Sequence, residues 1–202
     1  MIRRLKEADR FEVLEYLYQE PALNIFIIGD IENYGFDVDF QEVYAEIVDG
    51  IYQSVVLKYK INVLYYSHKT VFNPEWLALI NTMKYDFISG RKSLTDLIYK
   101  YFPNYKEKPM YFAEVTSFDS SLKVDESLII EAKTEEDCTL SFHLLKQVKE
   151  FDGMKNQELD DFVKSKMESL KHSKSYYIKQ NNKCVSTVST VADTTKSAMV
   201  VA

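Results

Sequence analysis

The sequence contains few of the residues that break or cross-link a chain: 5 glycines, 4 prolines and 2 cysteines among 202 residues. So little Gly and Pro argues against a collagen-like, linker-like or loop-dominated protein. Cys138 and Cys184 follow no pairing motif, so they do not form a disulfide framework. Apolar runs are far shorter than a membrane span, and none follows the basic opening residues as in a signal peptide. We therefore expect a globular, cytoplasmic protein with no membrane partner.

The chain also lacks an excess of positive charge, since 25 basic residues face 31 acidic ones and the net charge is -6. This balance gives no general attraction to phosphate backbones or anionic lipids. Tyrosine-rich stretches over residues 59–66 and 99–111 resemble base-stacking surfaces, but strand and helix periodicity accounts for most of these rings. We therefore expect no nucleic-acid partner. The 15 Tyr and 12 Phe are enough, at this length, for a hydrophobic core.

The first part of the chain is predicted to form one strand, two helices and three further strands, in that order. A short strand at Ile2–Leu5 precedes a helix with an apolar face that begins near Phe11. A second helix is expected from Asn24, as its cap, to Gly35. Three strands then follow at Glu42–Val48, Ile51–Tyr59 and Ile61–Ser67, the first two joined by a hairpin turn at Asp49-Gly50.

The same order recurs from Ser127 onward. Residues 128–130 form the short strand, and Thr134 with Asp137 makes a capping box at the start of the first helix. Asn156 is expected to cap the second helix. The three strands are predicted at Ser175–Lys179, Cys184–Ala192 and Ser197–Ala202.

Only the first copy continues beyond its third long strand. We expect a helix after Pro74, a strand at Tyr85–Ser89, a helix capped by Ser93 and a last strand at Met110–Val115. The polar stretch that follows marks a boundary. The predicted organisation is a first lobe over residues 1–116, a linker over 117–126 and a second lobe over 127–202.

The run Lys183–Val201, KCVSTVSTVADTTKSAMVV, is the most specific segment of the chain. It is similar to the hairpin of third and fourth strands in bacterial acetyltransferases of the GNAT superfamily that carry a degenerate GNAT-like lobe before the real one. Residue similarity is confined to this stretch, whereas the doubled order of elements extends the resemblance over the whole chain. The resemblance implies an α/β fold of two lobes, each a mixed, mostly antiparallel sheet with helices on both faces.

The same resemblance implies an acyl-CoA-dependent N-acetyltransferase that moves an acetyl group from acetyl-CoA to a primary amine. The family's fourth strand offers backbone groups to the pantetheine arm of the cofactor. On this sequence the matching residues are Met199, Val200, Val201 and Ala202. The family shapes its acceptor site between the two helices of the lobe, where this chain has Glu150, Phe151 and Asp152. A solvated helix end is the competing interpretation of these three residues.

The family's pyrophosphate loop, Arg/Gln-x-x-Gly-x-Gly/Ala, is missing from the sequence. In the first lobe the matching segment is Ser67–Pro74, which has no glycine and cannot easily bring its backbone onto phosphates. In the second lobe the given chain stops at Ala202, so we expect that lobe to be incomplete and the chain alone to be inactive. The alternative function is a catalytically silent scaffold or binding module. An uncovered fourth strand also predicts a homodimer through the C-terminal edge.

No residue stands out as a catalytic base. The fourth strand has no carboxylate, and Asp193 before it is better interpreted as a turn residue. Cys138 lies near a helix N-terminus, which favours a lower thiol pKa, but no histidine is near in sequence. His143 is expected to be an ordinary helix residue. No spacing of His, Cys and acidic residues indicates a metal site.

Overall fold

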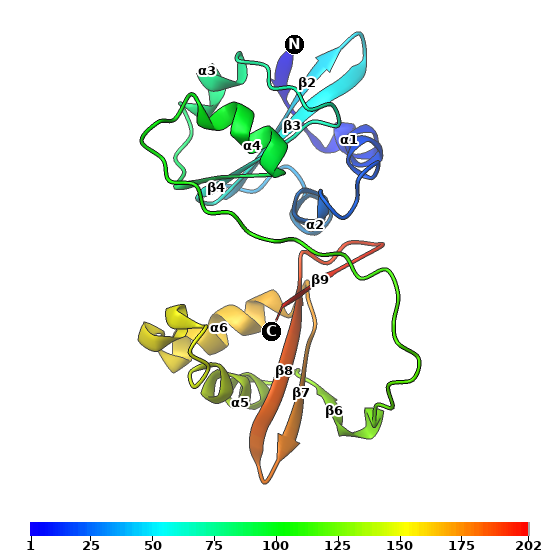
Figure 1. The fold of residues 1–202 in the computed structure, drawn as a ribbon, viewed down its shortest axis with the longest axis vertical. Helices are drawn as coiled ribbons and strands as arrows, with labels where there is room; N and C mark the ends of the chain where they lie inside the picture. Colours follow the sequence, from blue (N-terminus) through cyan, green and yellow to red (C-terminus); the bar gives the residue numbers. More distant parts are fainter. Residues whose placement is uncertain (202) are drawn as a thin grey trace. The chain divides into compact units, whose positions relative to one another are not determined.

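A computed structural model describes residues 1–201, apart from the side chain of Asp152. Ala202, predicted to be the last cofactor-contacting residue, lies outside the described residues. The described chain is an α/β protein with two sheets, each flanked by helices (Figure 1). It divides into two compact units, Met1–Glu114 and the part from Val115 onward. Each unit is described by itself below.

The first unit contains a five-stranded sheet in the order β1-β2-β3-β4-β5. Its neighbours pair antiparallel except β4 and β5, which run parallel. The strands are β1 (Ile2–Arg4), β2 (Gln41–Val48), β3 (Ile51–Tyr59), β4 (Asn62–Tyr66) and β5 (Phe87–Ser89). The helices are the 3-10 helix η1 (Glu7–Asp9), α1 (Arg10–Leu17), α2 (Ile25–Tyr34), α3 (Trp76–Ile80) and α4 (Lys92–Tyr99).

Local chemistry explains the ends of several elements. Asp49 and Gly50 both have positive φ, 51° and 78°, which fits the tight β2–β3 hairpin turn that the sequence predicts. Gly35, at φ 71°, ends α2 as expected. Asn24 stands at the predicted cap position of α2, but its side chain caps nothing and instead donates to the carbonyl oxygen of Leu17.

The two faces of the first sheet carry separate cores. Helices α1 and α2 pack on one face, where Val13, Leu17 and Ile28 lie fully buried against strand residues such as Val55. Helices α3 and α4 cover the other face (Figure 1). Their buried side chains pack on those of β3 and β4. The residues of this second core are Val56, Val63, Tyr65, Trp76, Ile80, Leu94 and Ile98.

The second unit contains a four-stranded antiparallel sheet in the order β6-β7-β8-β9. The strands are β6 (Ile129–Glu131), β7 (Ser175–Gln180), β8 (Lys183–Val191) and β9 (Met199–Val201). The helices are η2 (Glu126–Leu128), α5 (Glu135–Leu145), η3 (Asp152–Asn156) and α6 (Leu159–Ser169). Asn181 and Asn182, both with positive φ, form the β7–β8 turn, and the Thr134–Asp137 capping box is confirmed.

Helices cover only one face of the second sheet within the described residues. Ser141 on α5 approaches Thr187, and Lys166 on α6 contacts Ser189, two β8 residues that share a face. The neighbouring β8 residue Val188, on the opposite face, stays 38% exposed. The expectation of helices on both faces is therefore confirmed for the first unit and wrong for the described part of the second.

Other details also depart from the prediction. The strand expected at Met110–Val115 does not form: this segment has no strand partner, and Met110 and Tyr111 are exposed. Ser93 lies inside the first turn of α4 rather than at its cap, which is Arg91. Asn156 belongs to η3, and Glu158 takes the cap position of α6. For both helices, the cap position is taken by a residue two positions away from the Ser or Asn that the sequence favoured as the cap.

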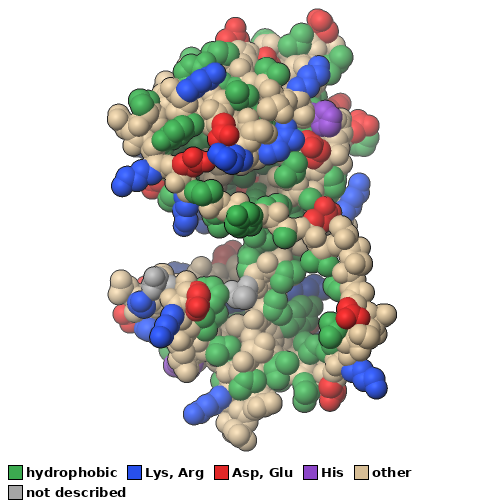
Figure 2. All heavy atoms as spheres, viewed as in Figure 1, with side chains coloured by type: hydrophobic (Ala, Val, Ile, Leu, Met, Phe, Trp, Pro, Cys, Tyr) green, Lys and Arg blue, Asp and Glu red, His purple; other side chains and the backbone are tan. Residues whose placement is uncertain are grey.

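Surface charge is mixed rather than segregated on the side of the first unit that Figure 2 shows, where basic and acidic side chains alternate with hydrophobic ones. Among residues 1–201, no helix combines the length and the apolar character that a membrane crossing requires.

Candidate functional site

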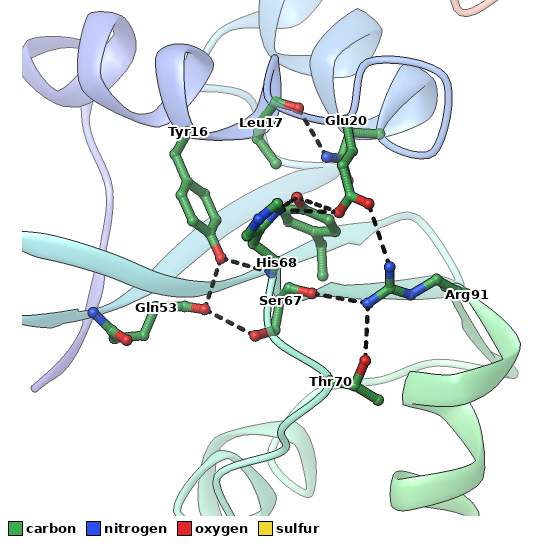
Figure 3. A network of polar contacts seen from close by, with 10 residues as sticks. Tyr16, Leu17, Glu20, Gln53, Ser67, His68, Thr70 and Arg91 are labelled. Atoms are coloured by element: carbon green, nitrogen blue, oxygen red, sulfur yellow. Dashed lines mark hydrogen bonds and ion pairs between the residues drawn. The ribbon is translucent and has the colours of Figure 1, made fainter.

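A polar cluster lies at the C-terminal end of β4 in the first unit, where the β4–β5 pair ends (Figure 3). Glu20, in the turn after α1, is its centre. The hydroxyl of Tyr66 donates to Glu20 Oε2 over 2.8 Å. His68 Nδ1 lies 3.4 Å from the same oxygen, and Arg91 Nη1 lies 3.4 Å from Glu20 Oε1. We call Glu20, Tyr66, His68 and Arg91 the Glu20 cluster.

A second layer of hydrogen bonds anchors the Glu20 cluster to the sheet. The Tyr16 hydroxyl donates to the Gln53 carbonyl oxygen over 2.7 Å and accepts the His68 backbone N–H over 3.1 Å. The Ser67 hydroxyl donates to the same Gln53 carbonyl. Long contacts of 3.5 and 3.4 Å join Arg91 Nη2 to Ser67 O and to Thr70 Oγ1. Arg91, which follows β5, therefore spans toward the segment that follows β4 (Figure 3).

Tyr66 of the Glu20 cluster and Tyr16 next to it both stay protonated at neutral pH. Burial raises the pKa of Tyr66, and its hydrogen bond to Glu20 raises it further because ionisation would place two negative charges together. Burial likewise raises the pKa of Tyr16. Both hydroxyls are therefore hydrogen-bond donors at neutral pH and not bases. Glu20 has three polar neighbours in the cluster, Tyr66, His68 and Arg91.

The parallel strands β4 and β5 stay in close contact beyond their last paired residues, Leu64 and Ser89. A Cβ atom on Gly90 would lie 2.8 Å from the carbonyl oxygen of Tyr65. Tyr65 itself is 2% exposed and forms an edge contact with the buried ring of Trp76. The backbones of β4 and β5 thus stay close together at the point where these two strands would have to separate.

Backbone amides at the start of α3 donate hydrogen bonds to groups in the segment just before them. The backbone N–H groups of Trp76 and Leu77 donate to the carbonyl oxygens of Asn73 and Pro74. The N–H of Glu75 donates to Oδ1 of Asn73 over 3.0 Å. Asn73 therefore satisfies the first turn of α3 from within the chain.

The predicted cofactor strand of the second unit forms β9, but only as a short edge strand. Met199 and Val201 pair with Val191 and Ser189 of β8. Val200 is 67% exposed. Among the described residues, β9 has a neighbour on one side only.

The three predicted acceptor-site residues follow one another in the chain after α5. Glu150 is exposed and Phe151 is half-buried in the connection between α5 and η3. The backbone N–H of Phe151 donates to the carbonyl oxygen of Val148, as in an ordinary helix end. Asp152 begins η3, and its side chain lies outside the described residues.

Other polar residues behave as the sequence suggested, with one correction. Asp193 accepts a 2.8 Å hydrogen bond from the Thr190 hydroxyl in the turn after β8, which fits a turn role. His143 is exposed on α5. Cys138 lies near the start of α5, but burial raises the pKa of its thiol, with acidic neighbours adding to the shift, so the expected lowering is wrong.

A groove of about 600 Å³ runs between α5 and α6. Its lining combines apolar and charged side chains: Glu135, Thr139, Leu159, Asp160, Val163, Lys164, Met167, Glu168 and Lys171. Over residues 1–201 no group of three His, Cys, Asp or Glu side chains is placed to hold a metal ion.

Sequence reasoning missed the Glu20 cluster. Glu20 and Arg91 are 71 residues apart, and Glu20 and Tyr66 are 46 apart. No spacing rule links such positions, because only the sheet topology brings them together. Comparisons with protein-family models, with curated proteins and with solved structures find no match.

Proposed function

We propose that this chain works in acyl-CoA-dependent N-acetyl transfer, with a catalytically silent first unit and a second unit that supplies the strand facing acetyl-CoA. The acceptor would be a primary amine. The hypothesis draws on the resemblance of residues 183–201 to GNAT acetyltransferases. It is supported by the order of elements in both units.

The first unit has the topology that such a lobe requires. Four strands pair antiparallel, two helices connect the first and second strands, and the fifth strand runs parallel to the fourth. The second unit repeats this order as far as its fourth strand, β9. The repetition supports the proposal of a common origin of the two units, in which β9 would correspond to β4.

One observation carries the proposed silence of the first unit: the contact of Gly90 with the Tyr65 carbonyl. In a GNAT lobe the fourth and fifth strands separate, and the pantetheine arm enters the gap. Here the corresponding gap is filled, and Arg91 reaches across its mouth toward Ser67. A thiol arm therefore has no path between β4 and β5.

The second unit differs because β9 has one free edge among the described residues. Its backbone groups on that side are available to hydrogen-bond an amide-rich cofactor arm. Residues 1–201 offer no glycine-rich loop to hold a pyrophosphate, so we expect binding of acetyl-CoA in the millimolar range at best.

Methyl NMR on the full chain with ¹³C-labelled methionine tests the two units separately. Met199 reports on β9, and Met83, which packs on the second core of the first unit, reports on the region of β4 and β5. Met199→Leu and Met83→Leu assign the two signals. We expect millimolar acetyl-CoA to shift the Met199 signal and leave the Met83 signal unchanged.

Two results would contradict the proposal. A shift of Met83 with saturation at micromolar acetyl-CoA would mean that the first unit binds the cofactor. No shift of Met199 at millimolar acetyl-CoA would favour the alternative, in which both units are a silent scaffold. Adenosine 3',5'-bisphosphate, which lacks the pantetheine arm, serves as a control for effects of the nucleotide alone.

A further inference from the structure

Lys166 occupies an unusual position on α6. It lies four residues after Phe162, the fully packed residue of this helix, and therefore on the same helical face. That face points to the sheet and to α5, where Phe162 contacts the ring of Phe142. An apolar side chain would be ordinary here. Lys166 instead brings an amine to the inner side of the helix and is itself half-buried.

The amine has a hydroxyl as its partner instead of a carboxylate. Lys166 Nζ donates to Ser189 Oγ over 2.6 Å. Ser189 in turn lies 3.0 Å from the hydroxyl of Ser175, opposite it on β7. Among the described residues, no acidic side chain forms an ion pair with Lys166. A neutral amine satisfies this environment with one N–H donor and keeps its lone pair.

The surroundings favour the neutral form. Burial lowers the pKa of Lys166, and the nearby Cys138 opposes this only in part. The Cys138 thiol is itself kept protonated by burial and bonds weakly to Met167 Sδ over 3.7 Å. It therefore gives Lys166 no fixed negative charge at neutral pH. A neutral lysine is a nucleophile, whereas an ammonium group is not.

The position of Lys166 along the sheet adds a second argument. Its partner Ser189 pairs directly with Val201 of β9. The amine is thus held on β8, the strand that pairs with the one to which the proposed function assigns the acyl thioester. By contrast, Lys164 on the same helix is exposed.

We propose that Lys166 is an acylation site, at which its ε-amine takes an acyl group from a small acyl thioester. The lone pair of Nζ attacks the thioester carbonyl carbon, a C–N bond forms and the C–S bond breaks. The electron pair leaves with sulfur, and one amine proton ends on the released thiol. The products are an amide at Lys166 and a free thiol. The nucleophilic role rests on the burial of Lys166 and on its contact with Ser189, and only the choice of acetyl-CoA as donor rests on the proposed function.

Competitive labelling of the full, folded chain tests this site without any variant. The chain is treated at pH 7, to low conversion, in two arms: the acetyl thioester of N-acetylcysteamine and acetyl-CoA. Peptide mapping by mass spectrometry then gives the acetylation rates of Lys166 and Lys164. With the small thioester we expect Lys166 to react several-fold faster, because burial lowers the pKa of its amine and so raises the fraction that is neutral at pH 7. The advantage should disappear in concentrated urea.

Matched variants assign the modification. Lys166→Arg should remove the fast acetylation seen in the intact mass, and Lys164→Arg should leave it. Equal or slower labelling of Lys166 in the small-thioester arm overturns the proposal. Fast labelling by the small thioester with none by acetyl-CoA supports the Lys166 site and counts against the proposed function.

Discussion

Gly90 lies so close to Tyr65 that a Cβ atom on Gly90 would be 2.8 Å from the Tyr65 carbonyl oxygen. The contact holds β5 against β4 just beyond their last paired residues. The glycine is required here for close approach, since its φ is not in the left-handed region.

Gly90→Ala should therefore destabilise the first unit. The obstacle is a backbone atom that cannot rotate away, so we expect a loss of about 1–3 kcal/mol in the free energy of unfolding. Trp76, the one tryptophan, is fully buried in this unit, and its fluorescence during urea unfolding measures the loss. Gly153→Ala is the control, since no atom lies within 4 Å of its added Cβ. Equal midpoints for the two variants would contradict the prediction.

The raised pKa of the buried Asp30 leads us to expect that the first unit becomes less stable as pH rises. Burial raises its pKa from 3.8 to about 7, although Lys60 opposes the shift. The folded state then binds this proton more tightly than the unfolded state, so the free energy of unfolding decreases between about pH 4 and 7. The decrease is about 4 kcal/mol at most. Asp30→Asn, which stays neutral, should flatten the slope in Trp76-detected unfolding at pH 5 and pH 8; an unchanged slope contradicts the assignment.

The lowered pKa of Asp137 leads us to expect that the second unit becomes less stable as pH falls. Burial raises its pKa, but the hydrogen bonds from the Tyr177 hydroxyl, from the Lys133 and Thr134 amides and from the Thr134 hydroxyl outweigh it and lower the pKa to about 2. This stabilisation is present above the unfolded pKa and is lost as pH falls from about 4 to 2.

The Met167 methyl signal reports unfolding of the second unit, because this side chain contacts Cys138 on α5. Tyr177→Phe removes one donor to Asp137 and should cost about 1–2 kcal/mol at pH 6 but less at pH 2. Tyr176→Phe, on the opposite face of β7, is the matched control. Equal effects of Tyr177→Phe at both pH values would contradict the role of Asp137.

Sequence reasoning succeeded where a few adjacent residues decide the geometry. The Asp49-Gly50 turn and the Thr134–Asp137 capping box follow from local hydrogen bonding and from φ preferences. It failed at Asn24, whose side chain turns to the Leu17 carbonyl, because tertiary packing offered a different partner. Local sequence patterns of this kind indicate which conformation or cap a residue favours. They do not indicate which residue, distant in the sequence, its side chain will contact.

Candidate sites were harder to predict than elements for the same reason. Nothing in the sequence marks Lys166 as a site residue. Only the packing of α6 against β8 brings it to Ser189. Likewise, Glu20, Tyr66 and Arg91 come from the end of α1, from β4 and from the start of α4. Their meeting depends on a five-stranded sheet order that no single motif encodes.

The free edge of β9 predicts self-association of the chain. Within residues 1–201, β9 pairs only with β8, and its outer backbone groups face no other strand. Natural edges are protected by Lys, Pro or a bulge, but Met199, Val200 and Val201 supply none of these. Antiparallel pairing of two copies about a two-fold axis would satisfy these groups and place Val200 near its own counterpart.

Val200→Lys should therefore shift a dimer toward monomer in sedimentation velocity experiments, because two like charges would face each other across the new pair. Val200 is the right position because it is 67% exposed, whereas Met199 and Val201 are half-buried and their replacement would disturb the unit itself. Val200→Thr keeps an uncharged β-branched residue and should leave the dimer intact. If the unmodified chain sediments as a monomer at the highest accessible concentration, the outer edge of β9 does not pair and the prediction is wrong.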